Sequence, residues 1–89
     1  MSPAAYVVDI GDVRDDVDRL PPGLASAFAE FRAAVADSPW TVARSINPAN
    51  ADAPLRLHLL RSDDGAAFVS YLVRDRDRVV DVLRVQWLA

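Results

Sequence analysis

Hydrophobic and polar positions alternate most clearly in the last third of the chain, residues 66–89. Two runs rich in β-branched and aromatic residues, 68–73 and 79–88, flank a charged connector at 74–78. This pattern predicts a β-hairpin. The second run is apolar on both faces, so we expect it to lie in the middle of a sheet. Simple alternation would place Val80 and Val82 on one face and the remaining apolar side chains on the other, namely Val79, Leu83, Val85 and Trp87.

Helical periodicity dominates the first third. After a predicted strand at 6–10, Asp12 is a candidate N-cap for a short helix whose apolar face carries Val13, Val17 and Leu20. Pro21-Pro22 ends that helix and begins the next. The second helix is expected to stop at Asp37-Ser38-Pro39. Its apolar residues form a stripe typical of an amphipathic helix, namely Leu24, Ala27, Phe28, Phe31, Ala34 and Val35.

Residues 40–54 are expected to be irregular because turn formers such as Asn47-Pro48 recur there. Residues 55–61 alternate as a strand, with three leucines on one side and Arg56, His58 and Leu60 on the other. Residues 62–65 form a hairpin loop. The element order β-α-α-β-β-β predicts a two-layer α+β domain, in which an antiparallel sheet carries a helical hairpin on one face.

Composition narrows the class of protein. The chain has 89 residues, which predicts one domain over residues 1–89. It has no cysteine, so disulfides and thiolate chemistry are excluded. No apolar run is long enough for a membrane span, and a cytoplasmic protein without membrane contact is expected. The net charge of −3 gives little long-range attraction to nucleic acid, so any such binding would need a local arginine cluster.

Few residues could carry chemistry. His58 is the single histidine, and no cluster at metal-ligand spacing or glycine-rich phosphate loop is present, so no metal or cofactor is expected. If Arg56, His58 and Arg84 share the face away from the helices, they form a positive patch beside Ser70 or Tyr71, with Arg61 close by. Such a patch could hold a phosphate. The alternative is that these arginines pair within the fold. The aspartates of the two hairpin loops are expected to be solvated connectors.

The arrangement resembles the RelE/ParE superfamily of toxin–antitoxin toxins. The matching segments are residues 6–10, Asp18-Arg19-Leu20-Pro21-Pro22, Tyr71-Leu72-Val73 and 79–85. Within the superfamily the chain is most similar to short actinobacterial proteins with a Trp after the helix pair and a Val-x-Val-Leu-x-Val-Gln-Trp ending, here Trp40 and the residues up to Trp87.

The resemblance implies a toxin of a type II toxin–antitoxin pair. RelE-type members are ribosome-dependent mRNA endoribonucleases that act from the open sheet face, and ParE-type members poison gyrase. The chain would then be a divergent or inactive ribonuclease with RNA or the ribosome as target and an antitoxin as partner. The candidate catalytic residues are Arg56, His58, Arg61, Tyr71 and Arg84.

The usual basic ending of the family falls on Gln86-Trp87-Leu88, and the chain has no lysine. An alternative hypothesis is therefore open. In that hypothesis the chain is a non-catalytic interaction module, which keeps the fold and binds a protein partner or a second copy of itself.

Overall fold

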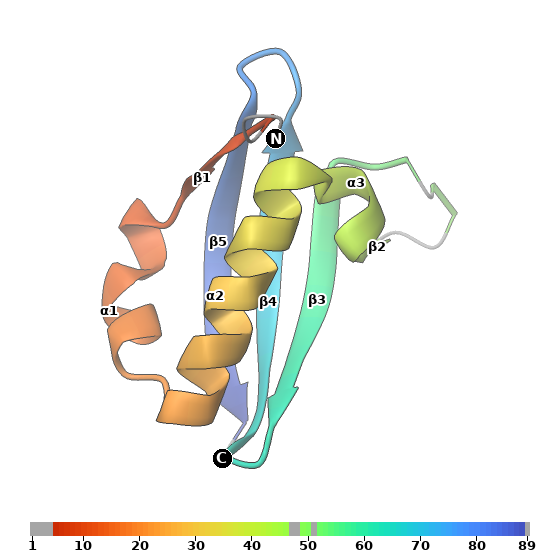
Figure 1. Cartoon of the computed structure of the whole chain (residues 1–89). Coiled ribbons are helices and arrows are strands. Elements are labelled where there is room, and N and C mark those ends of the chain that lie inside the picture. The colour runs from red at the N-terminus through yellow and green to blue at the C-terminus, as the bar shows by residue number, and fades with distance from the viewer. Residues whose placement is uncertain (1–4, 47–48, 51, 89) are drawn as a thin grey trace.

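A computed structural model describes residues 5–46, 49–50 and 52–88. It is a mixed α+β fold in which a helix layer lies on one side of a five-stranded sheet (Figure 1). The elements follow in the order β1 (Val7–Asp9), the 3-10 helix η1 (Gly11–Val13), α1 (Arg14–Asp18), α2 (Pro22–Asp37), α3 (Pro39–Val42), β2 (Arg44–Ser45), β3 (Leu55–Ser62), β4 (Gly65–Arg74) and β5 (Val79–Leu88).

The sheet has the strand order β1-β5-β4-β3-β2. The three long strands β3, β4 and β5 are antiparallel, as predicted. The sheet as a whole is mixed, because β1 pairs parallel to β5. β4 is the middle strand. The expectation that β5 is central holds only for Val79–Asp81, which pair with β1 on one side and β4 on the other. Beyond Asp81, β5 pairs with β4 alone.

The core lies between α2 and the inward row of β4. The α2 stripe buries Leu24, Phe28, Phe31 and Val35. The β4 row buries Ala67, Val69, Tyr71 and Val73 at every second position, as the pleat of a strand requires. The Phe31 ring lies 5.5 Å from the Tyr71 ring, centroid to centroid, in an edge-to-face arrangement. Aromatic pairs favour this geometry, so the contact fixes how the helix sits on the sheet.

The other helices are shorter than the sequence pattern indicates. The predicted first helix is a 3-10 turn followed by five residues of α1, and Asp12 makes no capping hydrogen bond. Val13 and Leu20 are nevertheless buried, as their spacing predicted. The segment expected to be irregular contains α3 and the two-residue β2. Asn47-Pro48 lie outside the described residues.

A β-bulge corrects the predicted faces of β5. Ser70 pairs with Arg84 but the next residue, Tyr71, pairs with Val82, so Leu83 is an extra residue in the ladder. A bulge of this kind shifts the side-chain alternation by one position. Val85 therefore lies on the same face as Val80 and Val82, toward the helices, and all three are buried. The expectation that Val85 points away from Val80 and Val82 is wrong.

Two aspartates of the hairpin turns are anchors rather than solvated connectors. Asp64 accepts a hydrogen bond from the backbone N–H of Gly23, in the first turn of α2, where the helix dipole favours a carboxylate. Asp75 accepts from the Tyr6 hydroxyl and, at 3.0 Å, from Trp40 Nε1. The β4–β5 turn is thereby connected to the N-terminal segment and to α3.

Candidate functional site

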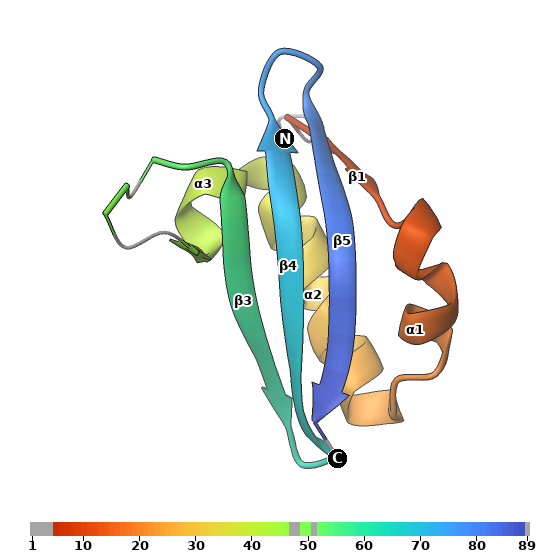
Figure 2. The ribbon, with the colours of Figure 1, turned by 180° about the vertical axis from the view of Figure 1, so that it is seen from behind.

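The sheet face opposite α2 is bare among the described residues. Seen from behind, β3, β4 and β5 have no element in front of them (Figure 2). Side chains on this face alternate with the buried row, and several are large and apolar. The exposed fractions are 36% for Leu55, 42% for Leu57, 37% for Phe68, 44% for Leu83 and 39% for Leu88. We call this surface, with the half-buried Leu59 and Leu72, the open face.

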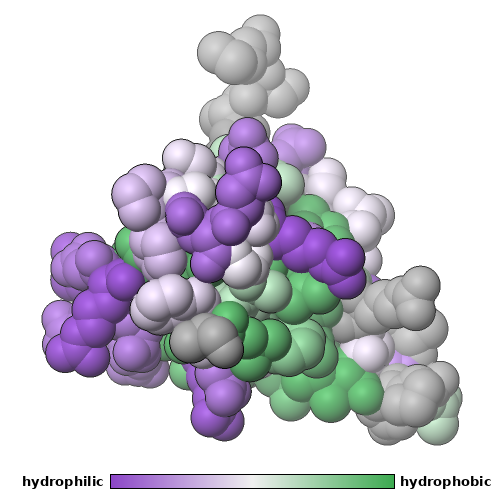
Figure 3. Space-filling model, turned by 90° about the horizontal axis from the view of Figure 1, so that it is seen from below, coloured by the Kyte–Doolittle hydropathy of each residue, from purple (hydrophilic) through white to green (hydrophobic). Residues whose placement is uncertain are grey.

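The exposed apolar side chains of the open face come from three neighbouring strands, β3, β4 and β5. Hydrophobic side chains gather below and to the right of the centre in Figure 3, whereas hydrophilic side chains cover the left of that view. Large exposed apolar patches commonly mark interaction sites. The open face is therefore the first candidate for a functional surface.

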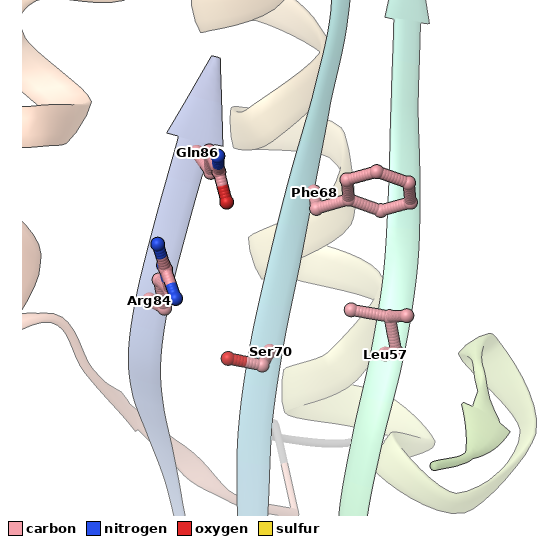
Figure 4. A pocket seen from close by; sticks show the side chains of 5 residues that line it. All are labelled: Leu57, Phe68, Ser70, Arg84 and Gln86. Atoms are coloured by element: carbon pink, nitrogen blue, oxygen red, sulfur yellow. The ribbon is translucent and has the colours of Figure 1, made fainter. Parts of the chain in front are cut away.

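A shallow pocket of about 260 Å³ lies on the open face, lined by Leu57, Phe68, Ser70, Arg84 and Gln86 (Figure 4). The ladder brings these residues together, because Ser70 pairs with both Leu57 and Arg84, and Phe68 pairs with Gln86. The side chains therefore divide into an apolar half on β3 and β4 and a polar half toward β5. This combination of apolar walls and a few hydrogen-bonding groups suits a polypeptide surface.

Arg56 lies on the opposite side of the sheet, under the segment that contains α3. It is only 6% exposed. Its Nε donates to the carbonyl oxygen of Ala43 at 2.8 Å, and Nη1 donates to that of Ala53 at 3.1 Å. The guanidinium carbon lies 5.5 Å from the centre of the Trp40 ring, in a cation–π arrangement. Arg56 therefore holds the α3–β2 segment and the start of β3 together.

His58 and Tyr71 also face the helix layer. The His58 ring stacks on Phe31, with centroids 5.0 Å apart. Burial lowers the pKa of His58, although a hydrogen bond with the backbone of Val42 opposes the shift. The Tyr71 hydroxyl donates to the carbonyl oxygen of Pro39 at 2.8 Å, and burial raises the pKa of Tyr71 even though Arg56 lies beside it. At neutral pH both groups are uncharged and occupied by contacts within the fold.

The predicted positive patch is therefore not assembled. The expectation that Arg56 and His58 share the open face with Arg84 is wrong, because their strand positions point toward α2. Arg84 and Ser70 do lie together on the open face, and Tyr71 lies on the other side. Arg61 is exposed near the β3–β4 turn, opposite Ala66. Catalytic roles for these five residues stay predictions.

The sequence does carry a signal for the open face, in the alternating leucines of β3. The leucines of β3 alternate with Arg56 and His58, and the polar set was expected to face outward. The structure reverses this assignment. Phe68 and Gln86 were not singled out, because their pairing across β4 and β5 depends on the bulge at Leu83.

In comparisons with known proteins, no family model, no curated protein and no solved structure matches this chain. Among the described residues, no three histidine or acidic side chains are grouped so as to hold a metal ion. In the same part of the chain, no helix has the length and apolar character needed to cross a membrane.

Replacing Arg56 tests its structural role. We expect Arg56→Met to lower the free energy of unfolding by roughly 2–4 kcal/mol, because buried carbonyl groups lose charged donors. The exposed Arg84→Met should change it by less than about 0.5 kcal/mol. Urea denaturation followed by tryptophan fluorescence measures both. Equal effects for the two variants would contradict the structural role of Arg56.

Stability should depend on pH through His58. Because its pKa is lower in the folded state than its ordinary value of 6.5, the unfolded chain binds more protons below that pH. The contribution of neutral His58 is complete above about 6.5 and is lost as the pH falls through the folded-state pKa. Asp75 cannot produce this loss, because its pKa is lowered from 3.8, chiefly by the hydrogen bonds from Tyr6 and Trp40, and it titrates at lower pH.

The melting temperature between pH 7.5 and pH 5 measures the effect. We expect it to fall for the natural chain and to change less for His58→Gln, whatever the absolute stability of that variant. His58 is the single histidine, so an identical slope in both proteins would show that the His58 environment is not the cause.

Proposed function

We propose that this chain is a non-catalytic protein-interaction module that self-associates through its open face. The observation that carries the proposal is a row of large apolar side chains, with Leu57 and Phe68 at its centre, on a sheet face that no described element covers. A second copy of the chain supplies a matching surface, because a two-fold interface brings the same patch of both copies together.

The size of the open face suits a weak dimer. A strand of ten residues is about 33 Å long, and three strands span about 14 Å, so the face has a flat area of roughly 500 Å² before side-chain relief is counted. Standard interfaces bury about 800 Å² per partner, and transient ones bury less. We therefore expect reversible association, with a dissociation constant on the order of micromolar.

The charges on the open face also permit two copies to meet. Asp81 is paired with Arg74, whose Nε lies 2.7 Å from Asp81 Oδ2. Arg84 stands beside neutral Ser70 and Gln86 rather than beside other cations. No block of one sign covers the face, so two copies do not repel each other strongly. An aligned pair of such faces resembles the packing of a two-sheet sandwich.

A charge placed on the open face should break the dimer. We expect Leu57→Lys to raise the dissociation constant at least about tenfold, because the ammonium group would be desolvated in the apolar half of the interface. Sedimentation velocity over a range of concentrations measures it. The matched control is Ala33→Lys, which places the same charge on the exposed side of α2.

Circular dichroism should show that both variants keep the fold. A natural chain that stays monomeric at about 1 mM would overturn the proposal. So would a dimer that Ala33→Lys weakens as much as Leu57→Lys does.

A toxin-like growth inhibitor is a second candidate function. What supports it is the order of the main elements: β1, α1 and α2 precede the three long antiparallel strands, with the short α3 and β2 in between, and the RelE/ParE resemblance implies a similar order. In this reading, Arg84 in the open-face pocket would contact a phosphate. Of the other two candidate arginines, Arg56 is buried and would support the fold, and Arg61 is exposed near the end of β3.

Induced expression in bacteria tests this candidate. We expect growth and protein synthesis to stop with the natural chain, and Arg84→Ala to relieve the arrest. Arg32→Ala, on the exposed side of α2, is the control and should not relieve it. Unchanged growth with soluble natural protein at a high level would count against a toxin.

A further inference from the structure

The outer edge of β3 carries main-chain groups that no described strand pairs. Val73 N–H donates to the carbonyl oxygen of Pro54, and Ile46 N–H donates to that of Leu55. In an antiparallel ladder, successive residues direct their backbone groups to alternate sides. Residues 54, 56, 58, 60 and 62 therefore bond toward β4, and the odd-numbered residues face outward.

β2 covers only the beginning of this outer edge, at Arg56 and Leu57. Beyond it, the N–H and C=O groups of Leu59 and Arg61 point outward with no described strand beside them. Four unpaired main-chain groups in a row form a template for one more strand.

A groove of about 310 Å³ runs beside this edge, between β3 and α2. Its lining is mixed in character: α2 contributes Ala27, Glu30, Phe31 and Ala34, and β3 contributes His58, Leu59, Leu60 and Arg61. Val42, at the end of α3, also lines it. The two alanines leave room where longer side chains would fill the space. In Figure 1, α3 and β2 lie over the upper part of β3, and the lower part of its outer edge is uncovered.

From this juxtaposition of an unpaired strand edge and a neighbouring groove, we infer that β3 binds an extended peptide segment of a partner protein, which adds as an antiparallel strand along Leu59–Ser62. Main-chain hydrogen bonds to Leu59 and Arg61 supply affinity, and side chains at alternate positions supply specificity. The inference is independent of self-association through the open face, which uses side chains of the sheet rather than its edge.

The side-chain preference of the peptide follows from the pleat. The residue opposite Leu60 points toward α2, into the space beside Ala27 and Ala34, so a small β-branched residue fits there. The residue opposite Arg61 points to the other side of the sheet. Arg61 forms no hydrogen bond or ion pair with another described side chain, so an acidic residue at that position gains a cross-strand charge pair.

The positive charge of Arg61 favours a peptide over a second copy of the chain. An antiparallel pair of β3 edges centred on Leu60 would place Arg61 of one copy opposite Leu59 of the other. Each guanidinium would then remain without a carboxylate. A peptide with the sequence acid-Val-Val, running antiparallel to β3, places the acidic residue opposite Arg61 and the first Val opposite Leu60, where its side chain enters the groove.

The probe is the capped pentapeptide Ac-Thr-Asp-Val-Val-Thr-NH2, titrated into ¹⁵N-labelled protein. We expect the largest amide shifts at Leu59 and Arg61, and slower amide hydrogen exchange at both. Shifts confined to Leu57, Phe68 and Gln86 would place the peptide on the open face and overturn the inference, as would no shift at about 5 mM peptide.

Two variants make the test specific. Leu59→Pro removes one outward N–H but no bond to β4, and proline is tolerated at such edge positions. We expect it to keep the fold and to lose at least about tenfold in affinity, whereas Leu59→Ala keeps the donor and binds within about threefold. If Leu59→Pro unfolds the chain, a charge swap takes the place of that variant. Arg61→Glu is then titrated with a peptide in which Lys replaces Asp.

Arg61→Glu should bind the Lys peptide at least about fivefold more tightly than either mismatched pair binds. The mismatched pairs are Arg61→Glu with the Asp peptide and the natural chain with the Lys peptide. Equal affinity for matched and mismatched charges would overturn the assignment of the acidic position. The dimer variant Leu57→Lys leaves this edge intact, so it should bind the peptide as the natural chain does. This result would distinguish failure of the peptide inference from failure of the dimer proposal.

Discussion

Packing of α2 on the inward row of β4 is the contact on which the rest of the structure depends. Leu24, Phe28 and Phe31 cannot be buried without a sheet face to cover them, and β4 supplies small and aromatic side chains at alternate positions. Once this contact forms, the pleat decides the side of every neighbouring position on β3 and β5. The leucines of β3 are directed to the open face because Arg56, His58 and Leu60 are directed to the helix layer.

The polar side chains on the buried side of the sheet are compatible with a core because each is satisfied there. Arg56 donates to two carbonyl oxygens and lies over Trp40, and Tyr71 donates to the carbonyl oxygen of Pro39. A buried arginine without such partners would be strongly destabilising. These hydrogen bonds also fasten the α3–β2 segment to the sheet, so α3 and β2 cover one end of β3 and leave the other end of its edge free.

Two surfaces of different character follow from this arrangement. The open face offers apolar side chains, and it suits another flat apolar surface. The free edge of β3 offers backbone hydrogen bonds beside a groove, and it suits an extended chain. The open-face pocket contains the cation Arg84 but no carboxylate or histidine in its lining. Phosphodiester chemistry needs a base, an acid and a cation at one point, so the open-face pocket suits binding better than that reaction.

By itself, the sequence determined the type and approximate position of the long elements. The 3.6-residue stripe of α2, the alternation of β3 and β4 and the hairpin signal at Asp63–Gly65 are local patterns, and local patterns can be read from a chain. Only the tertiary structure decided which side of each strand is buried. Leu55, Leu57 and Leu59 look like core residues in the sequence, and Arg56 looks like a surface residue.

The reversal has a physical reason. Partners outside the strand make the burial of Arg56 favourable, namely the carbonyl groups of Ala43 and Ala53 and the Trp40 ring, and the alternation along the strand does not reveal them. The bulge at Leu83, the parallel pairing of β1 and the uncovered edge of β3 likewise depend on which strands become neighbours in the sheet, and those pairings join segments far apart in the sequence.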